Sequence, residues 1–187
     1  MNIRMSEKEA ALFKAFVSTA KSYFEFGIGG STAFAAEVVQ GPLVAVDSDQ
    51  EWIAKAKESV PASPHERTFV FVDIGPTKQW GYPTSNEHRP KFPDYHSTIH
   101  AFKDMDFDLC LVDGRFRVAC FLQALKCLRS DAVIGLHDYR SRKNYHVVEN
   151  FARPIAEAAD MTFFVKRRGL DLAKVDAALE KYRYAAP

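Results

Sequence analysis

Four aspartates occupy equivalent places along the chain, each at or just past the end of a short apolar run. They are Asp47, Asp73, Asp113 and Asp138. Carboxylates in such places can bind ribose hydroxyls or coordinate a hard divalent cation. Any one of them could instead be the N-cap of a following helix. All four together, with a glycine-rich turn ahead of them, are better explained by a ligand site.

The glycine-rich turn precedes the first of these aspartates. Residues 25–32 read EFGIGGST. Glycine lets the backbone approach a ligand closely, and helix N-terminal N–H groups can face it. A side chain at Gly27 or Gly29 should block this approach. If the backbone φ at these positions is positive, a residue other than glycine would also be strained there. The spacing from Gly27 to Asp47 suits a nucleoside whose ribose diol is held by a carboxylate, which would also permit an NAD-dependent oxidoreductase.

Glu25 argues against the dinucleotide. It is a polar residue at the end of an apolar run, two positions before Gly27. A dinucleotide site has no need of an acid there, whereas the amino group of a zwitterionic amino-acid moiety does. A chain of 187 residues also leaves no room for a separate substrate domain. The sequence therefore favours a nucleoside that carries an amino acid.

Apolar runs alternate with amphipathic segments along the whole chain. We expect strands at residues 23–26, 43–46, 68–72, 107–112, 132–136 and 161–166. We expect helices behind a Ser6–Glu9 capping box and at residues 33–39, 51–59, 116–129, 144–151 and 171–182. Continuous apolar strands that alternate with helices are typical of a parallel sheet covered on both faces. The predicted fold is a doubly wound α/β three-layer sandwich, with residues 1–187 in a single domain.

Residues 75–106 interrupt this alternation of strands and helices. The segment holds four of the nine prolines together with Trp80 and Tyr82. Connections in compact domains typically take about 4–6 residues, and much longer ones are commonly functional. We interpret the segment as an ordered lid. Trp80 and Tyr82 would either line a substrate pocket or pin the lid in place.

Composition excludes several classes of protein. The chain has 25 Lys and Arg against 24 Asp and Glu, which argues against a dedicated nucleic-acid binder. No apolar stretch approaches the ~18 residues of a membrane span, and the N-terminus does not read as a signal peptide. Three cysteines without a Cys-x-x-Cys pair indicate neither a disulfide framework nor a zinc site. We expect a cytoplasmic protein and leave open whether it forms a homo-oligomer.

The ordered motifs resemble those of class I S-adenosylmethionine-dependent methyltransferases, which have a Rossmann-like fold. EFGIGGST at residues 25–32 is similar to their first motif, VAVD at 44–47 to the second and FVDI at 71–74 to the third. The resemblance implies that Asp47 binds the ribose hydroxyls and Asp73 the adenine amino group of S-adenosylmethionine. The remaining implied cofactor-binding residues lie in the first motif: Glu25, Gly27, Gly29 and Ser31.

A narrower resemblance concerns FDLCLVDG at residues 107–114 and VIGLHDY at 133–139. Both are similar to metal-assisted small-molecule O-methyltransferases of the macrocin and novobiocin type. The resemblance implies that Asp113 and Asp138 hold Mg²⁺ and that His137 serves as ligand or base. The alternative from the residues themselves is that the two aspartates cap helices or bind Arg115.

Two positions depart from that narrower pattern. Phe116 stands where relatives often carry a histidine as general base, and Tyr139 where catechol-type relatives carry asparagine. We therefore favour Arg115, or no ion at all, between Asp113 and Asp138.

The predicted activity is methyl transfer to an oxygen of a small molecule, with a nitrogen acceptor as the less favoured alternative, and with Asp113, His137 and Asp138 as catalytic residues. Arg115 and other cationic residues near the strand ends would suit an anionic acceptor. Besides the oxidoreductase, a nucleoside-binding protein that has lost catalysis remains an alternative, and Phe116 supports it.

Overall fold

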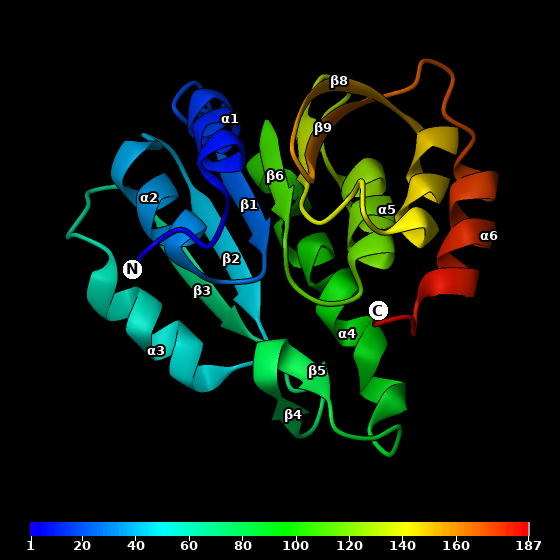
Figure 1. Cartoon of the computed structure of the whole chain (residues 1–187), viewed down its shortest axis with the longest axis horizontal. Coiled ribbons are helices and arrows are strands. Elements are labelled where there is room, and N and C mark those ends of the chain that lie inside the picture. Colours follow the sequence, from blue (N-terminus) through cyan, green and yellow to red (C-terminus); the bar gives the residue numbers. More distant parts are fainter. Residues whose placement is uncertain (187) are drawn as a thin grey trace.

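A computed structural model describes residues 1–186 of the chain as a seven-stranded sheet with helices on both faces (Figure 1). The strand order is β3-β2-β1-β6-β7-β9-β8. The strands are β1 (Tyr23–Phe26), β2 (Leu43–Asp47), β3 (Arg67–Phe71), β6 (Leu109–Val112), β7 (Val133–Leu136), β8 (Ala152–Ala158) and β9 (Met161–Lys166). The pairs among β3, β2, β1, β6 and β7 are parallel, and β9 runs antiparallel to both of its neighbours. The predicted doubly wound sheet is confirmed.

Alternate residues of the central strands pack into two hydrophobic cores, one on each face of the sheet. One core joins α1 (Glu7–Val17), α2 (Gly30–Val38) and α3 (Gln50–Ser59) to strand residues such as Tyr23 and Leu43. The other joins α4 (Phe92–Ser97), α5 (Arg117–Cys127) and α6 (Leu172–Tyr182) to residues such as Phe24 and Val44. Both faces of the strands are buried, which explains why their sequences are continuous apolar runs. The capping box at the start of α1 is also confirmed, since the Ser6 amide donates to Glu9 Oε2 at 2.8 Å.

The sequence missed strand β8. Residues 144–151 were expected to form a helix, but the structure has a 3₁₀ helix, η4 (Lys143–Asn150), which leads directly into β8. Pro154 lies within β8, next to a register shift against β9. This strand is at the edge of the sheet, where a missing N–H is tolerated. Its half-exposed sequence, ARPIAEA, lacks the apolar run by which the other strands could be recognised.

Residues 75–106 divide into two parts. The first contains a small hairpin of β4 (Thr77–Lys78) and β5 (Tyr82–Pro83), joined by the 3₁₀ turn η1 (Gln79–Gly81). The 3₁₀ turn η2 (Arg89–Lys91) follows it. The second part, α4 and the 3₁₀ helix η3 (Thr98–Met105), places aromatic and apolar side chains in the core. The prediction of an ordered lid therefore applies to the hairpin region alone.

Within residues 1–186, no helix combines the length and apolarity needed to cross a lipid bilayer.

Candidate functional site

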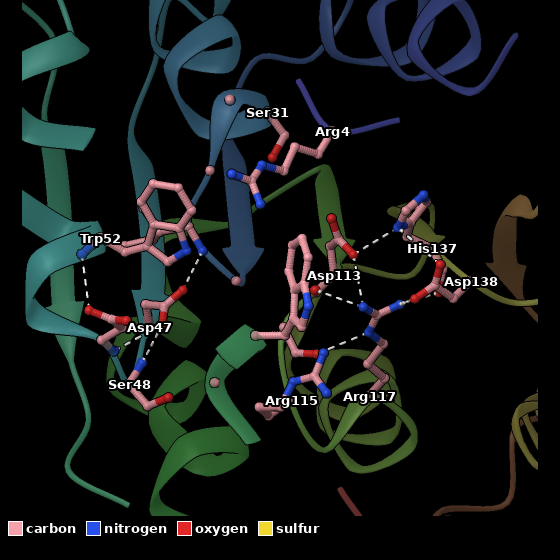
Figure 2. A pocket seen from close by; sticks show the side chains of 18 of the residues that line it. Arg4, Ser31, Asp47, Ser48, Trp52, Asp113, Arg115, Arg117, His137 and Asp138 are labelled. Atoms are coloured by element: carbon pink, nitrogen blue, oxygen red, sulfur yellow. Dashed lines mark hydrogen bonds and ion pairs between the residues drawn. The ribbon is translucent and has the colours of Figure 1, made fainter. Parts of the chain in front are cut away.

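A cavity of about 710 Å³ lies at the carboxyl ends of the parallel strands (Figure 2). Its wall is built from the N-terminal residues, the turn between β1 and α2, the end of β2 with the start of α3, the hairpin, and the ends of β6 and β7. The predicted site residues in this wall are Gly27, Gly29, Ser31, Asp47, Trp80, Tyr82, Asp113, Arg115, His137 and Asp138. Glu25 and Asp73 are not among the lining residues.

Gly27 and Gly29 of the turn have different roles. Gly27 has φ +100°, and a Cβ there would lie 2.5 Å from the amide nitrogen of Gly114, so two backbones pack directly against each other. Gly29 has φ −169°, which any residue can adopt, and a Cβ there would meet only Ser31 Oγ, at 3.9 Å. The expected positive φ therefore holds for Gly27 and is wrong for Gly29. Gly29 instead keeps space open beside the cavity.

Asp47 ties the glycine turn to the end of β2. Its buried carboxylate accepts hydrogen bonds from the amides of Ile28 at 2.7 Å, Ser48 at 2.7 Å and Asp49 at 3.0 Å. Burial raises the pKa of Asp47 to about 6 in spite of these donors. A carboxylate has about four acceptor positions, so one remains for a ligand hydroxyl. Ribose binding by Asp47 stays a prediction that this geometry permits.

Glu25 lies beneath the turn, fully buried, on the same face of β1 as Tyr23. Its Oε1 accepts a hydrogen bond from Ser31 Oγ at 2.5 Å, and within residues 1–186 its Oε2 has no hydrogen-bond partner of good geometry. Burial raises the pKa of Glu25 to about 8, so the group is mostly a neutral acid at pH 7. Ser31 lines the cavity and Glu25 does not. Glu25 therefore contacts the cavity wall through Ser31, and its role in cofactor binding stays a prediction.

Asp73 lies outside the cavity. Its side chain is 54% exposed, and its carboxylate accepts from Lys91 Nζ at 2.5 Å and from the Gly75 amide at 2.8 Å. The chain leaves edge strand β3 at Phe71, and Asp73 falls in the connection toward the hairpin. The predicted contact with an adenine amino group is not supported by this placement.

Arg117 closes the predicted metal site. Its Nη2 lies 3.0 Å from Asp113 Oδ1 and its Nη1 lies 2.8 Å from Asp138 Oδ2 (Figure 2). The same guanidinium donates to the carbonyl oxygens of Gly114, His137 and Asp113. All five N–H groups of a guanidinium are thus used.

The two aspartates therefore do not fit a divalent ion. A guanidinium lies where the ion would sit between them. The partner is Arg117, so the expectation of Arg115 is wrong. The described residues also contain no group of three or more His, Cys, Asp and Glu side chains that could hold a metal.

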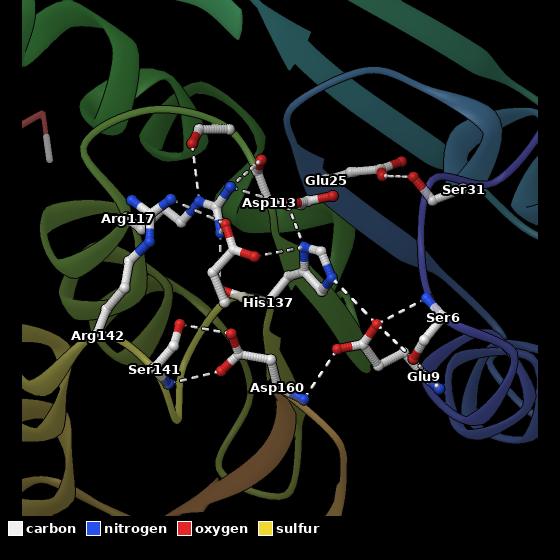
Figure 3. A network of polar contacts seen from close by, with 12 residues as sticks. Ser6, Glu9, Glu25, Ser31, Asp113, Arg117, His137, Ser141, Arg142 and Asp160 are labelled. Atoms are coloured by element: carbon white, nitrogen blue, oxygen red, sulfur yellow. Dashed lines mark hydrogen bonds and ion pairs between the residues drawn. The ribbon is translucent and has the colours of Figure 1, made fainter.

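His137 connects this charge network to helix α1. Its Nδ1 lies 2.8 Å from Asp113 Oδ1, and its Nε2 lies 3.7 Å from Glu9 Oε2 (Figure 3). Burial disfavours the charged ring, but the carboxylates of Asp113 and Asp138 outweigh burial and raise the pKa of His137 to about 9. Because an imidazolium cannot accept a further proton, this raised pKa disfavours His137 as a general base at neutral pH, and its catalytic role stays a prediction.

The two departures from the metal-assisted pattern face the protein core. Phe116 is buried at φ +53° and packs on Phe92 and Tyr95, with ring centroids 5.1 and 5.8 Å away. The hydroxyl of buried Tyr139 donates to Glu149. Neither Phe116 nor Tyr139 lines the cavity. Phe116 and Tyr139 therefore contribute to the packing and hydrogen bonding of the core rather than to the cavity wall.

Sequence reasoning missed a cation–aromatic contact at the cavity wall. The guanidinium carbon of Arg4 lies 5.4 Å from the ring centroid of Trp52 and 5.0 Å from that of Trp80. Trp80 is 57% exposed and has φ +67°, an uncommon backbone conformation for a side chain of this size. The three residues come from separate segments of the chain, and no spacing rule connects them.

Comparison with known proteins assigns the fold. No protein-family model matches the chain, and no curated protein matches it. Among solved structures, a methyltransferase-like protein from Silicibacter pomeroyi is 29% identical, with a TM-score of 0.86 over 100% of this chain and 98% of that chain. A Streptococcus mutans protein in complex with SAH (S-adenosylhomocysteine) is 10% identical, with a TM-score of 0.57 over 87% of this chain and 100% of that chain. A tRNA methyltransferase from Aquifex aeolicus is 13% identical, with a TM-score of 0.55 over 89% of this chain and 72% of that chain.

The chain therefore has the class I methyltransferase fold. The two more distant structures support the fold alone. The macrocin and novobiocin subgroup finds no support among these comparisons.

Proposed function

We propose that this chain binds S-adenosylmethionine in the cavity and transfers its methyl group to an oxygen atom of a small molecule. One observation carries the proposal. In a methyltransferase fold, the glycine turn and the Asp47 carboxylate form adjoining parts of one cavity wall at the carboxyl ends of the parallel strands. Ligands of open α/β sheets bind at this edge.

The residues of the turn would position the donor. Gly29 leaves open space and Ser31 presents its oxygen from the start of α2, while Asp47 offers its remaining acceptor position. S-adenosylmethionine would supply a methyl group already activated by the sulfonium. The protein's own task is then mainly to hold donor and acceptor in line.

The charge network limits which acceptors react. His137 holds its proton at neutral pH, and Asp113 and Asp138 are both paired with Arg117. None of the three predicted catalytic groups is thus a free base. The site therefore favours an acceptor oxygen that is already ionised, such as a carboxylate or an acidic phenol. The three residues would act by fixing the local charge.

Titration calorimetry with S-adenosylhomocysteine tests donor binding. Asp47→Asn should weaken it at least tenfold, because a hydrogen bond to a charged group contributes roughly 1.5–3 kcal/mol. Asp73→Asn is the matched control and should leave the affinity unchanged, since Asp73 lies outside the cavity. If folded wild-type protein bound NAD and not S-adenosylhomocysteine, the proposal would be wrong.

Turnover separates the enzyme from a non-catalytic nucleoside-binding protein. Transfer of labelled methyl to a panel of carboxylates and phenols is the expected result. Tight binding of S-adenosylhomocysteine without transfer to any acceptor would favour the non-catalytic alternative, which the absence of a free base among the three predicted groups also suits.

A further inference from the structure

Arg115 differs from its neighbour Arg117 in one decisive respect. Both side chains are buried and both line the cavity. Arg117 uses all five of its N–H groups. Arg115 is only 7% exposed, yet its Nε and Nη1 have no hydrogen-bond partner within residues 1–186. Buried charged donors are almost always paired, so an unpaired one indicates a missing acceptor.

The cavity wall leaves the charge of Arg115 without a carboxylate partner. Asp113 and Asp138 are neutralised by Arg117 and His137. Among the described residues, no carboxylate lies within 4.0 Å of the Arg115 guanidinium, which distinguishes it from Arg117 and Arg142. The part of the cavity around Arg115 is therefore cationic.

Tyr82 covers this cation. The guanidinium carbon of Arg115 lies 4.0 Å from the centroid of the Tyr82 ring. Gly81, beside it in the hairpin, has φ +72°, and a Cβ there would lie 3.7 Å from both Arg115 Cγ and Ser48 Oγ. The hairpin thus lies between the end of β6 and the end of β2. A shift of this short, half-exposed hairpin would uncover the guanidinium.

We propose that Arg115 binds an oxyanion of the methyl acceptor, a carboxylate or a phosphate, and that Tyr82 covers this subsite when it is empty. The proposal rests on the proposed function, because the acceptor is defined by the methyl transfer. A planar guanidinium can donate two parallel N–H groups to either oxyanion once the ring of Tyr82 has moved aside. The subsite selects an acceptor that already carries a negative charge. Such an acceptor suits a site that lacks a free base among its predicted catalytic groups.

Inorganic phosphate and acetate are the probes for this subsite. Each is titrated into the whole protein at constant ionic strength, and binding is measured by calorimetry and by the rise in melting temperature. Wild type should bind at least one of them. Arg115→Met should weaken that binding at least tenfold, and Arg115→Lys should restore part of it. Arg168→Met removes an exposed arginine outside the cavity and should behave as wild type.

Donor titrations show whether Arg115 belongs to the acceptor or to the donor. Arg115→Met should change the affinity for S-adenosylhomocysteine less than threefold. If it weakens S-adenosylhomocysteine but not methylthioadenosine, which lacks the amino-acid moiety, Arg115 binds the donor carboxylate and the proposal is overturned. Equal phosphate and acetate binding by wild type and Arg115→Met would also overturn it.

Tyr82→Ala is a second variant that leaves Arg115 intact. Removing the cover should strengthen anion binding at least threefold, and unchanged or weaker binding would contradict the covering role. Wild type that binds phosphate through Arg115 but does not bind S-adenosylhomocysteine would refute the proposed function while leaving an anion site in place. The two failures are therefore distinguishable.

Discussion

Two arginines, two positions apart, have opposite surroundings in this cavity. Phe116 between them adopts a left-handed conformation with φ +53°, and helix α5 begins at the next residue, Arg117. Arg117 is thereby surrounded by the ends of β6 and β7, while Arg115 lies against the hairpin. The sequence predicted an arginine between the aspartates but named Arg115. A positive φ at a phenylalanine is uncommon and leaves no trace in the sequence.

Arg117→Met should destabilise the folded protein by about 3–5 kcal/mol, since two partly buried carboxylates lose their shared partner. Urea denaturation measures the change. Arg140→Met removes an exposed arginine that pairs with exposed Glu157, and should change stability by less than about 1 kcal/mol. Similar losses in the two variants would contradict the central role of Arg117.

A chelator tests whether Arg117, rather than a divalent ion, lies between Asp113 and Asp138 in the working protein. Because Arg117 lies where a divalent ion would sit, a chelator should leave methyl transfer by the wild type unchanged. An assay with and without excess chelator, using any acceptor found active, is the measurement. Inhibition that added Mg²⁺ reverses would show that an ion displaces Arg117 in the working enzyme.

At the scale of elements, the sequence predicted what continuous apolar runs can reveal. All six expected strands exist, and the glycine turn lies where EFGIGGST placed it. The whole segment 75–106 is predicted to be a lid, but its side chains Phe92, Tyr95 and Ile99 are buried in the core. Composition alone could not separate them from Trp80 and Tyr82, because apolar side chains in an irregular segment can face either solvent or core.

The glycine turn permits a comparison between two single substitutions. Gly27→Ala should cost about 2–4 kcal/mol of folding stability, because φ is +100° and the new Cβ meets the Gly114 backbone. Gly29→Val should change stability by less than about 1 kcal/mol, since its backbone is extended and its surroundings are open.

Thermal melting and calorimetry with S-adenosylhomocysteine measure the two effects separately. Gly29→Val should lose donor binding at least tenfold while keeping its melting temperature. Wild-type affinity in that variant would show that the turn does not contact the donor.

Across the whole molecule, one polar network joins elements that are far apart in the sequence. Glu9 in α1 accepts from the amide of Asp160, between β8 and β9, at 2.9 Å and lies 3.7 Å from His137 (Figure 3). His137 continues the network to Asp113, and Arg117 continues it to Asp138. The sequence showed Asp113, His137 and Asp138 as a site, but Glu9 only as part of a capping box. A residue that serves both purposes cannot be recognised from local spacing.

This network should make folding stability fall at alkaline pH. The pKa of His137 rises from its ordinary 6.5 to about 9 in the folded protein, because the carboxylates of Asp113 and Asp138 outweigh the opposing effect of burial. A raised pKa means that the stabilisation is fully present below about pH 6.5 and is lost as pH rises toward 9. Asp113 behaves in the opposite sense: its pKa is lowered, so its contribution is lost only in acid.

Glu25 contributes to the same alkaline decline in a different window. Burial raises its pKa from 4.5 to about 8, so the folded state holds a proton that the unfolded state has already released between these values. Urea denaturation from pH 5 to about pH 9.5 separates the two groups. His137→Gln should reduce the fall between about pH 6.5 and 9 by at most ~3 kcal/mol and leave the fall below about pH 6.5 intact. Glu25→Gln should remove the part of the fall below about pH 6.5, reduce the part up to about pH 8 and leave the part between about pH 8 and 9 intact. A wild-type protein whose stability rises between pH 6.5 and 9 would show that His137 is neutral in the folded state, and would restore it as a candidate base.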